Sequence, residues 1–255
     1  MNLDPIKVAI FKAGKVILNA DPTKGVVTKD EGRLNFVTAT DLAVEKILKD
    51  AIQKNFPGHL ILSEETKSDI KDPLSVDHLW VMDPIDGTTN FRYERDYSGI
   101  SVAYVEKGEV QAGLVLNPFR NEFFHAQKGL GAFVGDKRLH VSSQLDINKA
   151  TIYSDDTYDP AGLRLTLEAL LRLPQVPWLL LRGSAVLEFC DVAAGRADLY
   201  FHRYLKPWDN AAGFLIVEEA GGIITNHKGE RVDFTSDQVI AGNPELVEKF
   251  VKAIA

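Results

Sequence analysis

The sequence predicts a mixed fold of the α+β or α/β class, in which two helices precede a sheet and helices alternate with strands further on. Three observations predict it. Apolar residues recur with a helical period near the N-terminus, and short apolar runs bounded by turn residues fill residues 59–140. From residue 159 onward the two patterns alternate. A chain of 255 residues can bury most of its apolar surface, so a self-sufficient core is expected.

The chain is predicted to begin with two helices. Residues 5–19 carry apolar side chains at a spacing close to 3.6, with Pro5 in the first turn. The polar stretch 28–35 predicts a loop or a short hairpin. A second helix is expected to start near Asp41, and its predicted inward face holds Leu42, Ile47, Leu48 and Ile52.

Short apolar runs after the second helix predict strands, at residues 59–62, 79–82, 99–105 and 110–116. Turn residues at 107–108 and 128–131 separate some of these runs. They favour an antiparallel meander over residues 98–140 rather than a series of crossover units.

Helices and strands alternate in the second half of the chain. The predicted helices are residues 159–173, 184–194, 210–220 and 244–254, and the predicted strands are residues 178–181, 199–201, 223–225 and 239–241. No linker rich in Pro, Gly or Ser separates two independent units. We therefore expect one domain over residues 1–255, in which an N-terminal half of about 1–140 packs against a C-terminal half of about 141–255.

Charge and cysteine content exclude several classes of protein. A formal net charge of −7 argues against sequence-independent binding of nucleic acid, which needs many Lys and Arg side chains. We expect a small ligand and no nucleic-acid partner. The single cysteine, Cys190, excludes an intrachain disulfide and fits an inert thiol in a packed helix. No signal peptide and no run of about 18 apolar residues occur, so we expect a cytoplasmic protein without membrane contact.

Two aspartates follow an apolar run in the segment 79–91. Pro84 restricts Asp83 to an extended conformation, and the turn after it can aim Asp83, the Ile85 carbonyl and Asp86 at one point. Carboxylate and carbonyl oxygens are the ligands that a hard cation such as Mg²⁺ prefers. The alternative is an ordinary surface turn, which Asp, Pro and Gly all favour.

Gly87 and Thr88 follow these oxygen ligands directly. Backbone N–H groups at such a turn, at the start of a helix, can bind a phosphate beside a metal ion. A phosphate ester is therefore a candidate ligand. Because the protein is acidic, bound cations are the simplest way to neutralise such a ligand locally.

Two further acidic motifs repeat the pattern of a carboxylate at the end of an apolar element. Glu64 and Glu65 follow the predicted strand at 59–62, and Asp209 stands at the start of the helix predicted at 210–220. A solvated strand end is the alternative for the glutamates, and a plain helix N-cap is the alternative for Asp209.

Together these motifs resemble the inositol monophosphatase family, a branch of the lithium-sensitive, Mg²⁺-dependent phosphatases. The segments that carry the resemblance are residues 38–41, 63–66, 80–91, 207–213 and 219–222, and they extend it over nearly the whole chain. The resemblance implies an alternating five-layer αβαβα sandwich of the sugar phosphatase type. It also implies a homodimeric phosphomonoesterase that hydrolyses inositol monophosphate or a related small sugar or polyol phosphate.

The resemblance also implies roles for individual residues. It implies two or three Mg²⁺ ions bound by Glu64, Asp83, the Ile85 carbonyl, Asp86 and Asp209. Glu64 and Thr88 would position the attacking water, and Asp41 would accept a hydrogen bond from the Thr88 hydroxyl. For Asp41 the alternative, compatible with that role, is an acidic side chain that favours the N-terminus of the second helix.

Substrate contacts are implied at two loops. The Gly87 and Thr88 N–H groups would bind phosphate oxygens, and the polyol would contact Gly183, Ser184, Ala185 and Asp209. Helix capping is the alternative for Ser184. Lys29 lies near the place where the family has a lysine that approaches the site of its own or a neighbouring subunit, and a solvated loop lysine is the alternative.

One departure from the family pattern concerns substrate range. Seven residues before Asp209, members selective for inositol carry a glutamate, whereas this chain has His202. A carboxylate can accept hydrogen bonds from two ring hydroxyls, but a neutral imidazole offers one acceptor and one donor. We therefore predict a looser polyol pocket with His202 at its mouth. The alternative is an exposed His202 that touches nothing.

Rival functions stay open from the sequence. Fructose-1,6-bisphosphatase, 3′-phosphoadenosine 5′-phosphate phosphatase and histidinol-phosphate phosphatase activities occur on related scaffolds. A non-catalytic regulatory binding protein on the same fold is an alternative of a different class, but broken metal ligands or a conspicuous basic or apolar surface would be expected of it. Zinc hydrolysis, a serine nucleophile elbow and P-loop chemistry are disfavoured because their motifs do not occur.

Overall fold

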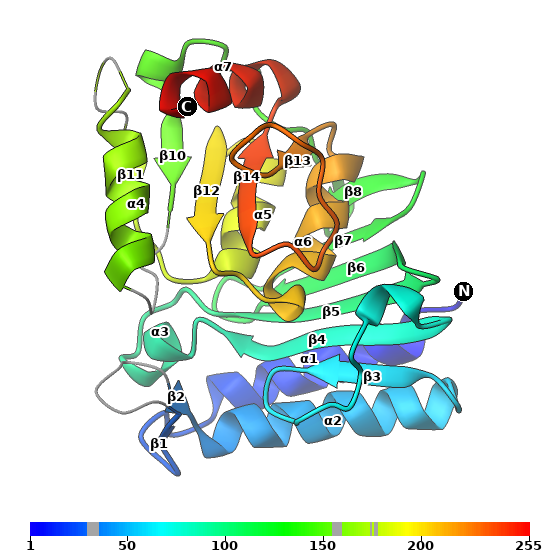
Figure 1. Cartoon of the computed structure of the whole chain (residues 1–255). Coiled ribbons are helices and arrows are strands. Elements are labelled where there is room, and N and C mark those ends of the chain that lie inside the picture. Colours follow the sequence, from blue (N-terminus) through cyan, green and yellow to red (C-terminus); the bar gives the residue numbers. More distant parts are fainter. Residues whose placement is uncertain (30–35, 155–159, 174, 176–177) are drawn as a thin grey trace.

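The computed structural model describes residues 1–29, 36–154, 160–173, 175 and 178–255. Helices and sheets alternate through these residues in five layers, in the order αβαβα (Figure 1). A seven-stranded sheet and a five-stranded sheet form the two β layers, and helices lie between them and on both outer sides. The five-layer sandwich implied by the resemblance is confirmed.

The first outer layer consists of α1 (Asp4–Leu18) and α2 (Ala39–Asn55). Their buried apolar faces pack against the larger sheet, which confirms both predicted helices. The predicted inward position of Leu42 is wrong, since 52% of this residue is exposed. The inward face of α2 follows a spacing of four residues through Val44, Leu48 and Ile52, and Leu42 lies about half a turn away from it.

The seven-stranded sheet has the order β3-β4-β5-β6-β7-β8-β9, in which β3 and β4 are parallel and the other neighbours are antiparallel. The predicted antiparallel meander is therefore confirmed. The strands are β3 (Leu60–Ser63), β4 (His78–Asp86), β5 (Gly99–Glu106), β6 (Glu109–Asn117), β7 (Glu122–Gln127), β8 (Gly131–Val134) and β9 (Lys137–Arg138).

The middle layer consists of α5 (Ala185–Ala193) and α6 (Pro207–Glu219). Every residue of α5 is buried, and so are residues 210–217 of α6, because both helices are covered by a sheet on each side. A helix that is covered on both sides is buried all round rather than along one face, and in α5 this includes the charged residues Glu188 and Asp191. Cys190 lies fully buried in α5, and burial raises the pKa of its thiol, as expected of an inert core cysteine.

The five-stranded sheet has the order β11-β10-β12-β14-β13. Its strands are β10 (Thr151–Tyr153), β11 (Trp178–Leu180), β12 (Leu199–Arg203), β13 (Ile223–Thr225) and β14 (Gln238–Gly242). The last layer, α4 (Pro160–Leu170) and α7 (Pro244–Ile254), packs on its outer face. The first residue of the helix predicted at 159–173 lies outside the described residues, and the short strand β10 was not predicted.

Five small elements complete the described part of the fold. The strands β1 (Val27–Thr28) and β2 (Phe36–Val37) pair as an antiparallel ladder, which fits the predicted hairpin, although residues 30–35 lie outside the described part of the chain. The short helix α3 (Thr88–Arg92) follows β4, and 3₁₀ turns occur at Pro73–Ser75 and Ile147–Lys149. No helix among the described residues has the length and apolarity of a membrane span.

Candidate metal and phosphate site

Three aspartates meet where the larger sheet packs against α6. Asp83 and Asp86 lie at the end of β4, and Asp209 lies in the first turn of α6. Ligand atoms of the three carboxylates lie within 4.8 Å of one another. Oxygen donors at this separation can hold a hard divalent cation such as Mg²⁺. The structure thus brings together three of the ligands that the sequence predicted.

The simpler alternatives for these aspartates do not describe the structure. Asp83 is 1% exposed and Asp86 is 8% exposed, so the segment is not an ordinary surface turn. Asp209 is not the N-cap of α6, a position that Lys206 occupies. Instead, the Asp209 carboxylate accepts the Lys206 N–H at 2.7 Å, which ties the start of the helix to the aspartate group.

An irregular stretch at the end of β4 aims its ligands. Asp83 pairs with Ser101 and Asp86 pairs with Gly99, so β4 has one more residue than β5 between these two pairs. Such a bulge re-aims side chains and frees backbone groups from the ladder. The Asp83 carboxylate accepts the Ile85 N–H at 3.0 Å, which holds the turn that carries the Ile85 carbonyl.

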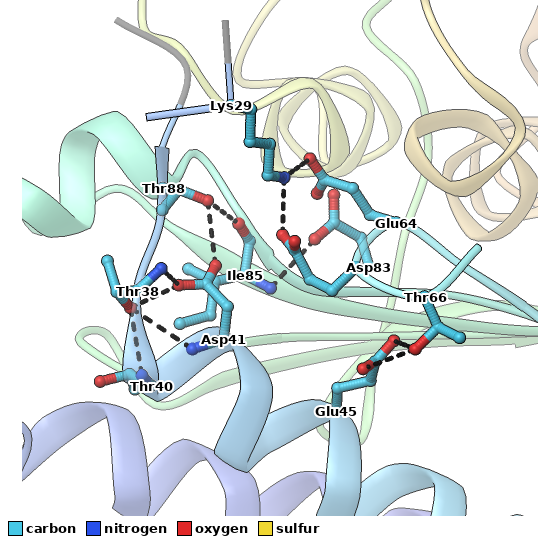
Figure 2. A network of polar contacts seen from close by, with 11 residues as sticks. Lys29, Thr38, Thr40, Asp41, Glu45, Glu64, Thr66, Asp83, Ile85 and Thr88 are labelled. Atoms are coloured by element: carbon cyan, nitrogen blue, oxygen red, sulfur yellow. Dashed lines mark hydrogen bonds and ion pairs between the residues drawn. The ribbon is translucent and has the colours of Figure 1, made fainter. Parts of the chain in front are cut away.

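Asp41 connects α2 to this turn. It is fully buried, and its carboxylate accepts the Thr38 N–H at 2.8 Å and also the Thr38 hydroxyl. The Thr38 hydroxyl oxygen accepts the Asp41 N–H at 3.4 Å, which together with the first of these bonds forms a capping box at the start of α2. The other Asp41 carboxylate oxygen accepts the Thr88 hydroxyl at 3.1 Å, and that hydroxyl also lies 2.8 Å from the Ile85 carbonyl (Figure 2). The capping interaction and the hydrogen bond to Thr88 therefore occur together.

Glu64 and Glu65 follow β3 and contact a lysine from the hairpin. The Lys29 ammonium lies 2.6 Å from a carboxylate oxygen of Glu64 (Figure 2). It also lies 2.7 Å from a carboxylate oxygen of Glu65. The solvated alternatives are therefore wrong for Lys29 and for Glu65, whose side chain is 4% exposed. Partial burial opposes the charge on Lys29, but the two glutamates outweigh it and raise the pKa of its ammonium.

Gly87 allows two loops of the site to approach closely. Its φ of +81° lies in the left-handed region that favours glycine. A Cβ at this position would lie 2.8 Å from the Gly183 carbonyl and 3.1 Å from the Tyr97 carbonyl. The predicted phosphate loop at 87–88 and the predicted polyol loop at 183–185 are therefore in contact.

Asp86 links the aspartate group to the start of α5. Its carboxylate accepts the Ser184 hydroxyl and, at 2.9 Å, the Val186 N–H. Ser184 is 1% exposed, and its hydroxyl does not cap α5. The capping alternative for this side chain is therefore wrong. Of the predicted polyol contacts, Gly183 is exposed, whereas Ser184 and Ala185 are buried.

Asn90 joins the same two loops, a role that sequence reasoning missed. Its side-chain amide lies within hydrogen-bond distance of three carbonyl oxygens, at 2.7 Å from Arg182, 2.9 Å from Tyr97 and 3.1 Å from Gly183. Asn90 stands in the motif at 80–91 and is 3% exposed. A buried amide with so many acceptors around it holds backbone in place, and only the folded chain reveals which backbone it contacts.

His202 lies in β12 and is 6% exposed, with its ring centroid 5.9 Å from that of Tyr200. The alternative of an exposed histidine that touches nothing is therefore wrong. Strand β12 ends at Arg203, and the chain then reaches Asp209 within the first turn of α6. His202 thus belongs to the strand that leads into the aspartate group.

The carboxylates of the site repel one another. Burial, followed by the charges of Glu64 and Asp86, raises the pKa of Asp83 well above its ordinary value. Burial and Asp86 raise the pKa of Asp209 in the same way, and burial and Glu64 raise the pKa of Glu65 to about 7. A divalent cation would relieve this repulsion, because its positive charge stabilises the ionised form of each carboxylate.

A layered fold with carboxylates gathered where a sheet meets a helix is the architecture of a protein that could hold divalent cations. Residues 3–255 match the model of the inositol monophosphatase family. This protein belongs to that family, as the resemblance implied.

Relatives from several bacteria match nearly the whole chain. The Nus factor SuhB of Salmonella typhimurium is 36% identical over 251 residues, which cover 94% of this chain and 90% of the relative. The structure of extragenic suppressor protein suhB from Bartonella henselae is 30% identical, with a TM-score of 0.89 and coverage of 99% and 97%. An IMPase of Thermotoga maritima is 32% identical, with a TM-score of 0.85 and coverage of 98% and 94%.

One further relative has been solved with two different ligands, inositol monophosphate and 2′AMP. SaIMPase-II, the inositol monophosphatase II of Staphylococcus aureus, has been solved with inositol monophosphate bound. It is 28% identical to this chain, with a TM-score of 0.80 and coverage of 98% of this chain and 93% of that chain.

Proposed function

We propose that this protein is a Mg²⁺-dependent phosphomonoesterase that hydrolyses inositol monophosphate or a related small sugar or polyol phosphate. The group formed by Asp83, Asp86 and Asp209, whose ligand atoms lie within 4.8 Å of one another, carries the proposal. Family membership, the Thermotoga IMPase and the inositol monophosphate complex of SaIMPase-II support it.

In this proposal the carboxylates and one carbonyl hold two or three Mg²⁺ ions, and the ligands are Glu64, Asp83, the Ile85 carbonyl, Asp86 and Asp209. Bound Mg²⁺ lowers the pKa of a water and neutralises the charge of the phosphoryl group. Six oxygen donors around a small cation are typical of Mg²⁺, and water completes the set where the protein supplies fewer. The oxygen-only donor set of this site fits that cation.

Thr88 and Asp41 orient the attacking water in the proposal. When the Thr88 hydroxyl donates its hydrogen bond to Asp41, the lone pairs of the Thr88 oxygen are left to accept a hydrogen bond from water. A water held in this way by Thr88 and Glu64 has its own lone pair directed away from them, toward the phosphorus. The Gly87 and Thr88 N–H groups would bind phosphate oxygens, and Gly183, Ser184, Ala185 and Asp209 would contact the polyol.

A substrate panel tests the proposal. The panel contains inositol, fructose, glycerol and adenosine phosphates, and we expect purified protein to release phosphate from the inositol or other polyol and sugar esters in Mg²⁺ and to lose this activity in EDTA. Competition by Li⁺ is also expected, because Li⁺ resembles Mg²⁺ in size but carries half its charge, so tens of millimolar should inhibit. Phosphate release that is unchanged in EDTA would contradict the proposed chemistry, and full activity in Li⁺ would contradict the lithium-sensitive part of it.

His202→Glu tests the predicted substrate range. If His202 lies at the pocket mouth, the wild type should accept several polyol phosphates, and the variant should shift the ratio of kcat/KM values toward inositol phosphate. A lost charge-assisted hydrogen bond costs about 1.5–3 kcal/mol, which corresponds to roughly ten- to a hundred-fold in selectivity. Unchanged ratios in the variant would remove His202 from the pocket, and a strict wild-type preference for inositol phosphate would refute the looser pocket.

A regulatory binding protein is the second candidate, because a relative 36% identical to this chain is named a Nus factor. The acidic ligand group of Asp83, Asp86 and Asp209 is present in this chain, which favours the enzyme over the regulatory protein. Fructose-1,6-bisphosphatase and 3′-phosphoadenosine 5′-phosphate phosphatase activities are separated from the main proposal by the same panel. Release of phosphate from none of these esters in Mg²⁺ would favour the regulatory candidate.

A homodimer in the cytoplasm, with each chain folded as one domain over residues 1–255, completes the proposal. Large apolar side chains near the five-stranded sheet support a partner copy, since Leu171, Trp178 and Leu181 are 76%, 71% and 57% exposed. Apolar groups of this size rarely stay uncovered in numbers on a monomer.

A further inference from the structure

A row of charged side chains runs along one face of α2 beneath the site. Asp41, Glu45 and Lys49 are spaced by four residues, so they lie on the same side of the helix. Asp41 contacts Thr88 in the candidate site. Glu45 and Lys49, one and two turns further on, contact Thr66 instead, as Figure 2 shows for Glu45.

The contacts of Thr66 use both hydrogen-bonding functions of its hydroxyl. The hydroxyl lies 2.9 Å from one Glu45 carboxylate oxygen and 3.0 Å from the other, and it donates to this carboxylate. It also accepts a hydrogen bond from the Lys49 ammonium, which lies 3.1 Å from Glu45. The orientation of the hydroxyl is therefore set by two partners on α2.

Burial makes this contact more than a surface ion pair. The Glu45 side chain is 8% exposed and that of Lys49 is 21% exposed. A carboxylate that is largely removed from water needs donors around it, and loss of one donor leaves the charge poorly compensated. Glu45 thus holds Thr66 firmly, although Thr66 itself lies at the surface.

Thr66 ends the short turn that carries Glu64 and Glu65. This turn follows β3, the edge strand of the larger sheet, which pairs with β4 alone. Glu64 comes one residue after the last pair between these strands, Ser63 with Met82, whereas Asp83 and Asp86 pair with Ser101 and Gly99 of β5. The end of an edge strand has hydrogen bonds on one side only and is less constrained. Glu64 therefore needs attachments that the sheet does not provide; Lys29 supplies one at the two carboxylates, and Thr66 supplies another at the end of the turn.

We propose that Glu45, with Lys49, is a positioning residue that acts through Thr66 to hold the Glu64–Glu65 turn at the metal site. The inference rests on the proposed function, because it concerns the affinity of the proposed cation ligands. Removal of the Thr66 hydroxyl lets the turn move, so divalent cations bind more weakly. Turnover at saturating Mg²⁺ changes much less, because excess cation restores the loaded site.

Direct metal binding in the absence of substrate tests the inference. The signal of free Mn²⁺ in electron paramagnetic resonance reports how much of the ion is bound by wild type, Thr66→Val, Thr66→Ser and Glu45→Gln. Loss of a residue that orients a metal ligand costs roughly 10–100-fold in affinity. We expect Thr66→Val and Glu45→Gln to weaken Mn²⁺ binding about ten-fold or more, and Thr66→Ser to stay close to wild type.

The same helix offers a matched control. Lys46 and Asp50 form an exposed ion pair at 2.7 Å, with side chains 74% and 61% exposed, so Lys46→Ala should leave Mn²⁺ binding unchanged. Titration of kcat against Mg²⁺ should show a raised Mg²⁺ requirement for Thr66→Val with kcat close to wild type.

The outcomes separate the inference from the proposed function. A wild type that binds no Mn²⁺ would overturn the proposed function itself. A wild type that binds Mn²⁺ with a folded Thr66→Val that binds it equally well would overturn only the positioning role. Unfolding of both Thr66→Val and Glu45→Gln would show that the contact supports the fold and not the turn, and would also overturn it.

Discussion

Asp83→Asn is expected to lower turnover of phosphate esters by roughly a thousand-fold while the protein stays folded. The substitution keeps the size of the side chain and an oxygen that can accept the Ile85 N–H, but it removes one charge from the metal group. Asp209→Asn should act in the same way. Steady-state kinetics over a range of Mg²⁺ concentrations, together with thermal unfolding, measure both effects.

The unfolding measurements give this prediction a second readout. Because Asp83 is buried among like charges, its replacement by asparagine should stabilise the protein in EDTA. Mg²⁺ should raise the midpoint of thermal unfolding of the wild type, and this increase should shrink in Asp83→Asn. Asp50→Asn, at an exposed position on α2, is the control and should change neither quantity. Near-normal turnover of Asp83→Asn at saturating Mg²⁺ would contradict the assignment of Asp83 as a metal ligand.

Gly87→Ala is expected to cost about 2–5 kcal/mol of unfolding free energy and most of the activity. A left-handed conformation costs a residue with a Cβ about 1–2 kcal/mol, and overpacking costs about 1–3 kcal/mol more. Both apply at Gly87, since its φ is +81° and its Cβ would lie 2.8 Å from the Gly183 carbonyl. To relieve that clash, the loop at residues 87–88 would have to move away from the loop at residues 183–185. Urea unfolding and the phosphate-release assay measure the two losses.

Gly58 provides the matched comparison. Its φ is +88°, but a Cβ there would meet nothing within 4 Å, so Gly58→Ala carries the conformational cost alone. We expect about 1–2 kcal/mol for this variant and no loss of activity at saturating substrate. Equal losses of stability in the two variants would mean that the approach of Gly87 to Gly183 contributes nothing.

Much of the site was predictable because its ligands lie in short motifs. Asp83, Ile85 and Asp86 stand within four residues at the end of an apolar run, and the local pattern of Pro and Gly already restricts the backbone. Asp209 was found in a similar way, at the start of a helix. Elements with long runs, such as α1 and β6, were predicted for the same reason, whereas β10 was missed although β11 and β13, which are equally short, were predicted from their apolar residues.

Contacts between distant segments were not predictable. The Ser184 hydroxyl was expected to touch substrate or to cap a helix, but it donates to Asp86, 98 residues earlier in the chain. Lys29 and Thr66 likewise form their hydrogen bonds and ion pairs with residues 17 to 36 positions away in the sequence. Such partners depend on the order of strands in a sheet and on the packing of its two faces, which local periodicity does not encode.

Asp86 belongs to β4 in the N-terminal half, yet its carboxylate accepts hydrogen bonds from Ser184 and Val186 at the start of α5 in the C-terminal half. Asp209 also belongs to the C-terminal half. A cation shared by Asp83, Asp86 and Asp209 would therefore bind to two segments that lie far apart in the sequence, and neither segment alone offers all three carboxylates. The free energy of cation binding would therefore stabilise the protein only after these two segments have packed together. In the proposed enzyme, the concentration of Mg²⁺ would then affect the stability of the folded protein as well as its turnover rate.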